Sequence, residues 1–590
     1  MNFGFKKLNI QRLFGELLRL LADQNAIFFI LAIAVGCLAA LGGHVFTWLI
    51  VQVRTFVFHN VNLLDPAQSL PWYIIVFAPA IGGGIVGVIG YWVAEVKGEG
   101  VPFIIENVAL RSGRIRKRLA VWGAVGSAIT LGSGGSTGKE GPIVQIGAAL
   151  GAIVASFARV STEKIRTLVA CGAAAGIAGI FNAPIGGSLF AAEVILGDFG
   201  LTTFSPVILA SVAGTVVARS LRGDVRELSV PRYALVHPTE LLFYFFLGLL
   251  CALVAFIFIR TLYATEEGVL RLKANRKITV LLPLAGGLCV GLIGLKFPQV
   301  FGPWTYKTIE LATEGKIFFL TAFMLVLAKI LATSLTLGTG GSGGVFAPSL
   351  FLGSLLGSSM GSMFHNLWPE KTALPGAYAV VGMAALVAAT TQAPLTAILI
   401  LFEMTDSYTM ILPLMVACMT SALLLRRLNG GESIYTERLA RKGINIRAGR
   451  SRNVLQELTV ADAMDKQVRT VSETLSLKNL LSILPEVRHV TSFPVVDSEG
   501  QLSGIISFSD FQSYVFEESL RDVVIVKDIS TKEVNTVFPD DNLEVALQKL
   551  GTKDVAHLPV VDRENPRRVV GMVSRRDIVN EHNKTLLRYA

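Results

Sequence analysis

Residues 132–142, "GSGGSTGKEGP", carry five glycines and one Lys-Glu pair between two apolar segments. A phosphate-binding loop would place a glycine five positions before the Gly-Lys pair and a Ser or Thr directly after it. This chain has Ser133 and Glu140 at those two positions, so a phosphate loop is excluded. A glycine-rich loop with one acidic residue therefore needs a different chemistry here.

The same kind of loop recurs at 338–348, "GTGGSGGVFAP", where six residues repeat at an offset of 206. A second pair of segments, 181–193 and 391–403, repeats an Ala-Pro step and a final glutamate at an offset of 210. Two motifs that recur in the same order at nearly equal offsets indicate two related halves. The match of Glu193 with Glu403 favours a structural role for both carboxylates.

Each glycine loop precedes an expected helix, and the N-terminus of a helix offers unpaired N–H groups and a partial positive charge. Two such loops facing each other between the halves would form a site for a small anion. Glu140 would then act as a tethered anion: ionised, it blocks the site; protonated or displaced by a mobile anion, it swings away. The alternative is that the Glu140 carboxylate only stabilises its own helix.

The composition predicts which elements must position these loops. The chain has 590 residues, of which 52% are hydrophobic and 16% charged, and residues 26 to about 425 form nearly continuous apolar runs. Several of these runs are shorter than the about 20 residues of a simple spanning helix and contain Gly or Pro. We therefore expect a membrane domain with interrupted helices, a pattern typical of channels and transporters.

Basic residues lie at the flanks of the apolar part, which predicts a multi-pass protein of the cell (inner) membrane with both termini in the cytoplasm. The flanking residues are Lys6, Lys7, Arg12, Arg111, Arg114, Arg116, Lys117, Arg118, Arg426, Arg427, Arg438, Arg441 and Lys442. Because the net charge of +10 comes largely from these flanks, we expect the lipid bilayer, and no nucleic acid, as a partner. The five cysteines stand singly in apolar runs and predict neither a zinc site nor a disulfide framework.

Over roughly 26–439 these motifs resemble the CLC family of chloride channels and chloride/proton antiporters. "GKEGP" at 138–142 resembles the gating loop of that family, which implies that Glu140 is the external gate. "GGVFAP" at 343–348 resembles the second anion loop, in which the backbone N–H groups of Val345 and Phe346 would bind the anion.

Two further positions complete the pathway that the resemblance implies. Tyr435, in "GESIYTERLA", resembles the inner tyrosine whose hydroxyl faces the central anion, and "KGEGVP" at 97–102 resembles the first loop, with Glu99 and Gly100 as candidate anion-binding residues. The implied fold is a multi-pass α-helical membrane protein of inverted repeats with interrupted, tilted helices over 26–440, preceded by a cytosolic segment 1–25. The implied assembly is a homodimer with one chloride pore in each subunit.

Two departures from the family pattern bear on the activity. Many members carry Ser where this chain has Glu99, and a carboxylate there is protonated, turned toward the cytosol, or a second gate. Antiporters of the family commonly carry a second glutamate, for inward proton transfer, where this chain has Val194. Valine cannot carry a proton, which favours a passive, voltage- or pH-gated chloride channel; the alternative is a chloride/proton antiporter with weak or water-mediated proton coupling.

The C-terminal part contains its own repeat, which resembles a cytosolic α/β pair of CBS domains at 455–518 and 524–586. Such pairs often bind adenine nucleotides, so ATP or AMP is a possible ligand, and no other cofactor is expected. The candidate nucleotide-binding residues are Thr470, Ser507, Asp510, Thr536, Ser574 and Asp577. The alternative is that both aspartates only cap helices, because Ser and Asp three residues apart are ordinary capping residues.

Two other classes of membrane protein fit the sequence less well. An intramembrane zinc protease would show HExxH, and no two of the seven histidines are four residues apart, so no enzyme is predicted. A divalent-cation channel regulated by CBS domains would need acidic or carbonyl ligands in its pore. Glycine loops at helix N-termini repel cations, which disfavours that class.

Overall fold

The computed structural model describes residues 24–65, 70–93, 96, 100–111, 113, 115–224, 228, 231, 233–272, 276–405, 407–441, 455, 458–483, 492–512, 514, 520–552 and 555–588. The chain divides into two compact units, Met1–Gly443 and Ile444–Ala590, here called the membrane unit and the C-terminal unit. The expected cytosolic segment 1–25 lies almost entirely outside the described residues, and so does Glu99.

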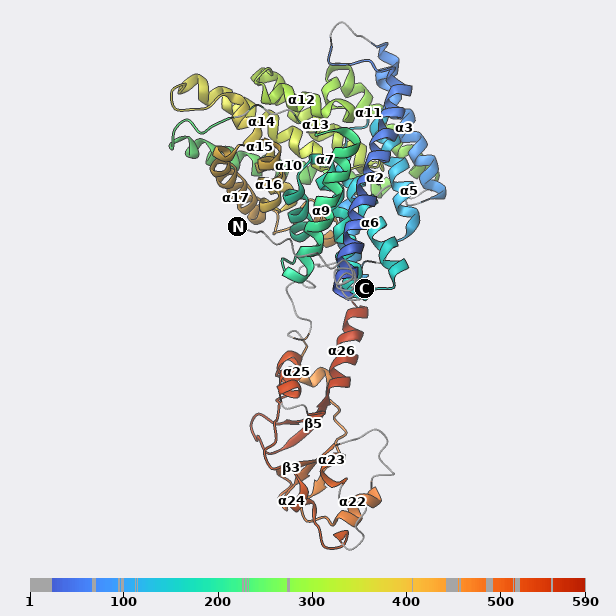
Figure 1. The fold of residues 1–590 in the computed structure, drawn as a ribbon, viewed down its shortest axis with the longest axis vertical. Coiled ribbons are helices and arrows are strands. Elements are labelled where there is room, and N and C mark those ends of the chain that lie inside the picture. Colours follow the sequence, from blue (N-terminus) through green and yellow to red (C-terminus); the bar gives the residue numbers. More distant parts are fainter. Residues whose placement is uncertain are drawn as a thin grey trace, which may run out of the picture. The chain divides into compact units, whose positions relative to one another are not determined.

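The regular elements that the structure describes in the membrane unit are all helices (Figure 1). Its first half contains α2 (Gln24–Phe58), α3 (Trp72–Trp92), α4 (Gly100–Leu110), α5 (Lys117–Gly132), α6 (Glu140–Ala158), α7 (Thr162–Phe181), α8 (Pro184–Phe190), a π-helical segment (Ala191–Leu196) and α9 (Leu201–Arg222). Its second half contains α10 (Glu240–Leu272), α11 (Arg276–Lys296), α12 (Thr305–Thr313), α13 (Phe319–Gly338), α14 (Phe346–Leu367), α15 (Pro375–Thr391), α16 (Pro394–Thr405), α17 (Ile411–Leu428) and the short α18 (Glu437–Arg441). Short 3-10 segments lie at Pro298–Val300, Gly302–Trp304 and Tyr408–Met410.

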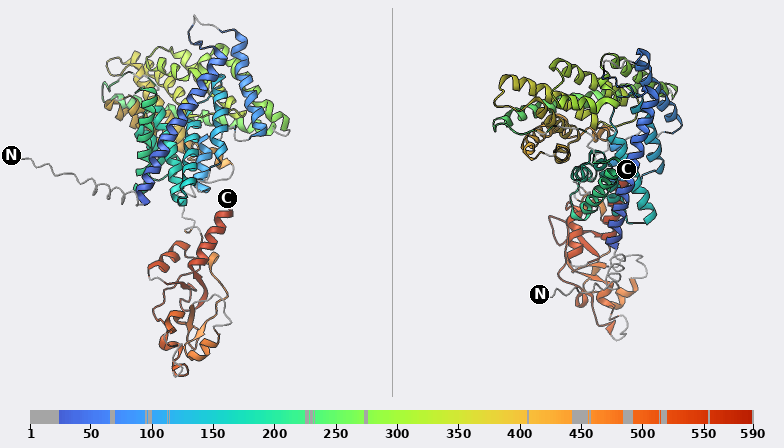
Figure 2. Two further views of the ribbon diagram at one scale, coloured as in Figure 1. Left: turned by 45° about the vertical axis from the view of Figure 1, so that its right-hand side comes forward. Right: turned by 45° about the horizontal axis from the view of Figure 1, so that its top comes forward.

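Eight of the described helical segments are long and apolar enough to cross a membrane. Others are too short, among them α4, α8 and α16. The helices run at several different angles to one another, as two further views show (Figure 2). The membrane unit is thus a multi-pass bundle of tilted and interrupted helices, as expected from its broken apolar runs.

Facing glycines bring consecutive helices into close contact in both halves. A Cβ on Gly147 of α6 would lie 2.1 Å from the carbonyl oxygen of Gly172 of α7. In the second half, a Cβ on Gly353 of α14 would lie 2.2 Å from the carbonyl oxygen of Gly382 of α15. Both distances are far below van der Waals contact, so only glycine allows these helix backbones to pack directly. The two helix pairs correspond at offsets of 206 and 210.

A second set of contacts joins the halves through small hydroxyl side chains. The Ser136 amide donates to Thr336 Oγ1 at 3.1 Å, and the Ser342 amide donates to Thr130 Oγ1 at 3.2 Å. Each bond is the other's counterpart at an offset of 206, with the roles of the two halves exchanged. This exchange is the contact pattern of a two-fold axis that passes between the glycine loops.

The C-terminal unit contains two α/β repeats. The first has α21 (Val460–Ala463), β1 (Val471–Ser472), α22 (Leu477–Ile483), β2 (Ser492–Val496), β3 (Leu502–Ser507) and α23 (Phe508–Phe511); the second has α24 (Val526–Ile529), α25 (Leu543–Thr552), β4 (His557–Val561), β5 (Val569–Ser574) and α26 (Arg575–Arg588). In the first repeat β1 pairs parallel with β2, and β2 pairs antiparallel with β3. In the second, β4 pairs antiparallel with β5, and Val537 forms a parallel bridge to Val560. Each sheet has its own hydrophobic core, and the two repeats exchange a helix between these cores: Val460 of α21 packs in the core of β4 and β5, and Val526 of α24 packs in the core of β2 and β3.

Candidate anion pathway and gate

The two glycine loops of the membrane unit touch through their backbones. The amide of Gly138 donates to the carbonyl of Gly344 at 2.8 Å, and the amide of Gly344 donates back to Gly138 at 2.8 Å. A Cβ on Gly344 would lie 2.8 Å from the nitrogen of Gly141, so a larger residue would push the loops apart. The structure therefore brings together the two helix N-termini that the sequence predicted would face each other, those of α6 and α14.

Gly134 and Gly340 occupy equivalent places in the two loops. Their φ angles are 103° and 111°, in a region that residues with a side chain rarely adopt. Each follows the end of the preceding helix, α5 or α13, and turns the chain toward the next helix. The repeated glycine is thus required by the turn itself.

Glu140 is the first residue of α6 and is only 1% exposed. Its Oε2 accepts a hydrogen bond from the amide of Ala347 at 3.2 Å, in the first turn of α14. Its Oε1 accepts from the hydroxyl of Tyr306, on α12. The carboxylate therefore spans the contact between the two halves, which the alternative of stabilising α6 alone does not explain.

Tyr306 was not singled out from the sequence. It lies 166 positions from Glu140, in a segment that repeats no motif of the chain. Only the folded chain places its phenol at the gate, so a single sequence carries no signal for it.

The second-loop residues Val345 and Phe346 lie at the start of α14. Phe346 is the first residue of α14 and is buried, and Val345 directly precedes the helix. The first N–H groups of a helix have no carbonyl partner inside that helix. The amides of Val345 and Phe346 therefore belong to the same positive helix end that binds Glu140 through Ala347.

Tyr435 is buried in the segment between α17 and α18. Its amide donates to Ser433 Oγ at 3.2 Å, and the Tyr263 hydroxyl fixes the neighbouring carbonyl of Ile434 at 2.6 Å. Tyr435 lies within electrostatic range of the Glu140 carboxylate. The structure thus places Tyr435 and Glu140 in one region.

Gly100 begins α4 with φ = 60°, and its amide donates to Gln145 Oε1 of α6 at 3.3 Å. A Cβ on Gly100 would lie 3.9 Å from the carbonyl oxygen of Gly343, so the first loop borders the second anion loop. The neighbouring Glu99 lies outside the described residues.

Val194 is buried in the π-helical segment Ala191–Leu196. Its neighbour Glu193 accepts hydrogen bonds from the amides of Leu395 (3.3 Å) and Thr396 (2.8 Å), in the first turn of α16. Reciprocally, Glu403 of α16 accepts from the amides of Ile185 and Gly186, in the first turn of α8, at 3.0 and 2.7 Å. Each carboxylate thus caps a helix of the opposite half, which supports the structural role expected for the pair.

A cavity of about 250 Å³ adjoins the gate and is here called the gate cavity. Its lining residues are Thr47, Ile50, Val51, Arg54, Leu131, Thr137, Gly138, Lys139, Gly302, Pro303, Tyr306 and Ala347. The charged members of this set, Arg54 and Lys139, are both basic. The gate cavity therefore favours anions next to the Glu140 carboxylate.

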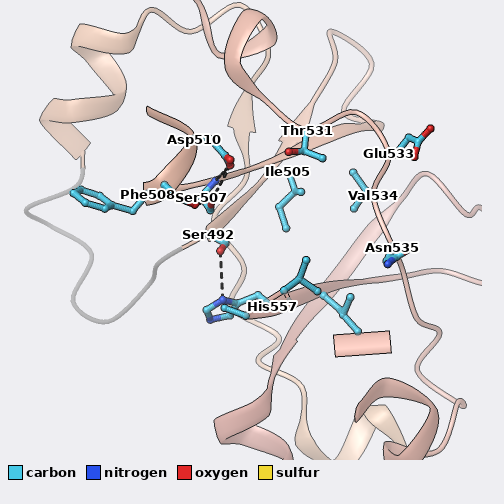
Figure 3. Close-up of a pocket in the computed structure, with 14 residues that line it drawn as sticks. Ser492, Ile505, Ser507, Phe508, Asp510, Thr531, Glu533, Val534, Asn535 and His557 are labelled. Atoms are coloured by element: carbon cyan, nitrogen blue, oxygen red, sulfur yellow. Dashed lines mark hydrogen bonds between the residues drawn. The ribbon is translucent and has the colours of Figure 1, made fainter. Parts of the chain in front are cut away.

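A cleft of about 560 Å³ lies within the C-terminal unit (Figure 3). It is lined by Ser492, Ile505, Ser507, Phe508, Ser509, Asp510, Thr531, Glu533, Val534, Asn535, Val555, Ala556, His557 and Leu558. Two of the six candidate nucleotide residues, Ser507 and Asp510, belong to this lining. Thr470, Thr536, Ser574 and Asp577 are not among the residues that line this cleft.

Both aspartates cap helices, as the alternative interpretation expected. Asp510 Oδ2 accepts from the amide and hydroxyl of Ser507 at 2.6 and 2.7 Å. Asp577 Oδ2 accepts from the amide and hydroxyl of Ser574 at 3.0 and 2.6 Å. Asp510 differs in that it lines the cleft. His557 reaches the same cleft, its Nδ1 3.4 Å from Ser492 Oγ, and burial lowers its pKa although Asp577 opposes the shift.

Within the described residues no group of three or more His, Cys, Asp or Glu side chains could hold a metal ion.

Comparison with known proteins assigns both parts of the chain. Residues 82–426 match the family described as voltage gated chloride channel, and residues 460–517 and 526–583 each match the CBS domain. A protein of Ralstonia nicotianae, named as a ClcB-like chloride channel protein, is 34% identical over 419 residues, or 70% of this chain and 96% of its own length. The H(+)/Cl(-) exchange transporter ClcA of Yersinia pestis is 31% identical over 461 residues, covering 76% and 95% of the two chains.

Among solved structures, a slow cyanobacterial Cl-/H+ antiporter superposes with a TM-score of 0.64 at 28% identity and covers 70% of this chain and 97% of its own. The predicted fold class, a multi-pass helical membrane protein of inverted repeats followed by an α/β CBS pair, is therefore confirmed.

Proposed function

Because the chain belongs to the voltage-gated chloride channel family, we propose that it carries chloride across a membrane in exchange for protons, with Glu140 as the gate. One observation carries the proposal: the buried Glu140 carboxylate bridges the two helix N-termini at the contact of the glycine loops. A carboxylate held by the amides of an anion site competes directly with a mobile anion for those amides.

The proposed cycle uses groups that this chain supplies. Chloride enters the gate cavity, attracted by Lys139 and Arg54, and competes with the Glu140 carboxylate for the amide of Ala347. The displaced carboxylate takes up a proton from water in the gate cavity and becomes neutral. Chloride then passes between the loops toward Tyr435, while the amides of Val345 and Phe346 stabilise its charge without a full positive charge, so that it can leave again.

Chloride/proton exchange is better supported than passive chloride conduction, which the sequence favoured. The Yersinia relative is named an exchange transporter and the cyanobacterial structure an antiporter, although the Ralstonia relative is named a channel. Val194 still requires a route for protons between Glu140 and the cytosol that does not use a side chain at that position. We propose that water supplies this route.

Reconstitution into liposomes with an outward chloride gradient, followed by external pH, tests the proposal. An antiporter moves protons uphill as chloride leaves, whereas a passive channel carries chloride without net proton movement. Chloride flux with no proton movement would overturn the exchange proposal and restore the channel interpretation. Flux of a divalent cation without chloride flux would overturn both.

We further propose that the protein is a homodimer in the cell (inner) membrane with both termini in the cytoplasm, as the family resemblance and the basic flanks imply. Subunit counting by single-molecule photobleaching in bilayers tests the assembly. Protease protection of a C-terminal tag in inverted vesicles tests the orientation.

The C-terminal unit supports a second role, regulation by an adenine nucleotide. The cleft beside Asp510 is large enough for such a ligand, and its lining combines hydroxyl, amide and apolar groups. We propose that Asp510 meets the ribose hydroxyls and that Ser507 lies near the phosphate. Calorimetry on the purified full-length protein with AMP, ATP and adenosine tests this role; no heat with any of them would leave helix capping as the function of both residues.

A further inference from the structure

Tyr306 is in direct contact with the gate from outside the two glycine loops. Its hydroxyl donates to Oε1 of Glu140, while the Ala347 amide occupies Oε2. The carboxylate is therefore held at both oxygens, by the second anion loop on one side and by α12 on the other. A hydrogen bond to an ionised acceptor is roughly twice as strong as one between neutral groups.

A fully buried lysine fixes the start of α12, and thus the position of Tyr306. Lys329 of α13 is 0% exposed, and its Nζ donates to the carbonyl of Val300 at 2.8 Å and to Thr305 Oγ1 at 2.9 Å. It also lies 4.8 Å from the centre of the Phe351 ring. Because an unpaired buried ammonium is costly, these contacts hold residues 300–305 tightly against α13.

The ring of Tyr306 is also fixed on the side of the gate cavity. The ammonium group of Lys139 lies over it, 5.0 Å from the ring centre. A cation over the face of an aromatic ring is attracted to it and restricts its rotation. The bonds of Lys329 to the Val300 carbonyl and the Thr305 hydroxyl, together with the ring contact with Lys139, direct the phenol at Glu140.

We propose that Tyr306 is a positioning residue that holds the ionised Glu140 side chain in its closed position and thereby sets the pH and chloride concentration at which the gate opens. This inference rests on the proposed function of Glu140. Once the carboxyl group gains a proton, the phenol no longer donates to a full negative charge and the closed position loses its advantage.

Other charged and titratable groups of the described residues also act on Glu140. Lys139 belongs to the same loop, Arg54 of α2 lines the gate cavity, and Lys329 and Tyr435 lie within electrostatic range. Tyr306 differs from them in donating a neutral side-chain hydrogen bond directly to the carboxylate. The phenol is thus the side chain whose loss should change the closed state with least change in local charge.

Tyr306→Phe removes the hydroxyl and keeps the ring, and Tyr233→Phe is a matched control. The Tyr233 hydroxyl donates to the carbonyl of Thr313 at 2.6 Å, at the other end of α12. In liposomes, chloride flux through Tyr306→Phe should reach half its maximum at an external pH about one unit higher than wild type, a roughly tenfold lower proton concentration. Tyr233→Phe should keep the wild-type midpoint.

A double variant separates positioning from packing. On a Glu140→Gln background, Tyr306→Phe should change neither the pH profile nor the flux, because the bond it removes no longer involves a charge. A wild-type pH profile in Tyr306→Phe, or an equal shift in both backgrounds, would overturn the proposal.

An infrared titration needs no transport and keeps the outcome separate from that of the proposed function. The carboxyl band that Glu140→Gln removes should appear at a higher pH in Tyr306→Phe than in wild type, whether or not the protein moves chloride. An unchanged band would overturn the role of Tyr306 even where chloride flux is intact.

Discussion

The two glycine loops turn the backbone in a similar way but carry different side chains at equivalent positions. At an offset of 206, the position of Glu140 in the first loop is occupied by Phe346 in the second. The first loop supplies the Glu140 carboxylate, which we propose moves, and the second supplies the amide of Ala347 that donates to it. Two carboxylates at these places would repel each other by several kcal/mol at an intermediate dielectric, if separated by about 4 Å. A symmetric scaffold can therefore hold a gate only if the gating side chain is present in one half.

A contrasting pair shows where symmetry is kept. Glu193 and Glu403 are equivalent at an offset of 210, and each caps a helix of the opposite half with two backbone bonds. Their carboxylates make fixed contacts, so both halves can carry one. Where a carboxylate is structural it is duplicated, and where we propose that it moves it is single.

Replacing the single carboxylate should have the largest effect. We expect Glu140→Gln to abolish proton movement and the dependence of chloride flux on external pH, because an amide cannot accept the proton or compete as an anion. Liposome flux with simultaneous pH recording measures both. Glu163→Gln is the control, since Glu163 also lies in the first turn of a helix, α7, but away from the loops. A Glu140→Gln protein that stays strongly pH-dependent would show that the gate has been assigned to the wrong residue.

Making the second loop resemble the first should come next. Phe346→Glu places a second carboxylate at the equivalent helix start, so we expect chloride flux at neutral pH to fall by roughly tenfold or more through repulsion of the anion. The flux should partly recover as the external pH is lowered and carboxyl groups gain protons. Phe346→Gln controls for the lost ring, and the charge argument fails if both variants lose flux equally at every pH.

The sequence predicted that the two loops are equivalent and meet. It did not predict the side chains from distant helices that contact Glu140. The repeated glycines at an offset of 206 predicted that the loops would meet, since glycines at turns and close contacts leave a local mark in the sequence. Tyr306 and Lys329 leave none, because their contacts with Glu140 and Thr305 depend on how distant helices pack. The internal repeat also showed that Glu193 and Glu403 are equivalent, but it could not show that each one caps a helix of the other half.

The duplicated carboxylates should give a smaller and equal effect in both halves. Glu193→Gln and Glu403→Gln should each lower the free energy of unfolding by about 1–3 kcal/mol, because each leaves a charge-assisted pair of helix-capping bonds weakened. Thermal unfolding followed by tryptophan fluorescence gives the comparison. The pH midpoint of chloride flux should stay at its wild-type value in both; a changed midpoint in only one of them would mean that this carboxylate also takes part in proton transfer.

The smallest expected effect separates a structural from a functional carboxylate in the C-terminal unit. Asp510 and Asp577 cap equivalent helices with the same two bonds, so each change to Ala should cost about 1 kcal/mol in stability. Only Asp510 lines the cleft, so nucleotide affinity should fall several-fold in Asp510→Ala and stay unchanged in Asp577→Ala. Thermal unfolding measures the shared cap and calorimetry with AMP measures the difference. Equal loss of affinity in both variants would mean that nucleotide binding depends on the stability of the repeats. Both aspartates make the same capping bonds, so the loss of a cap would affect the two variants alike.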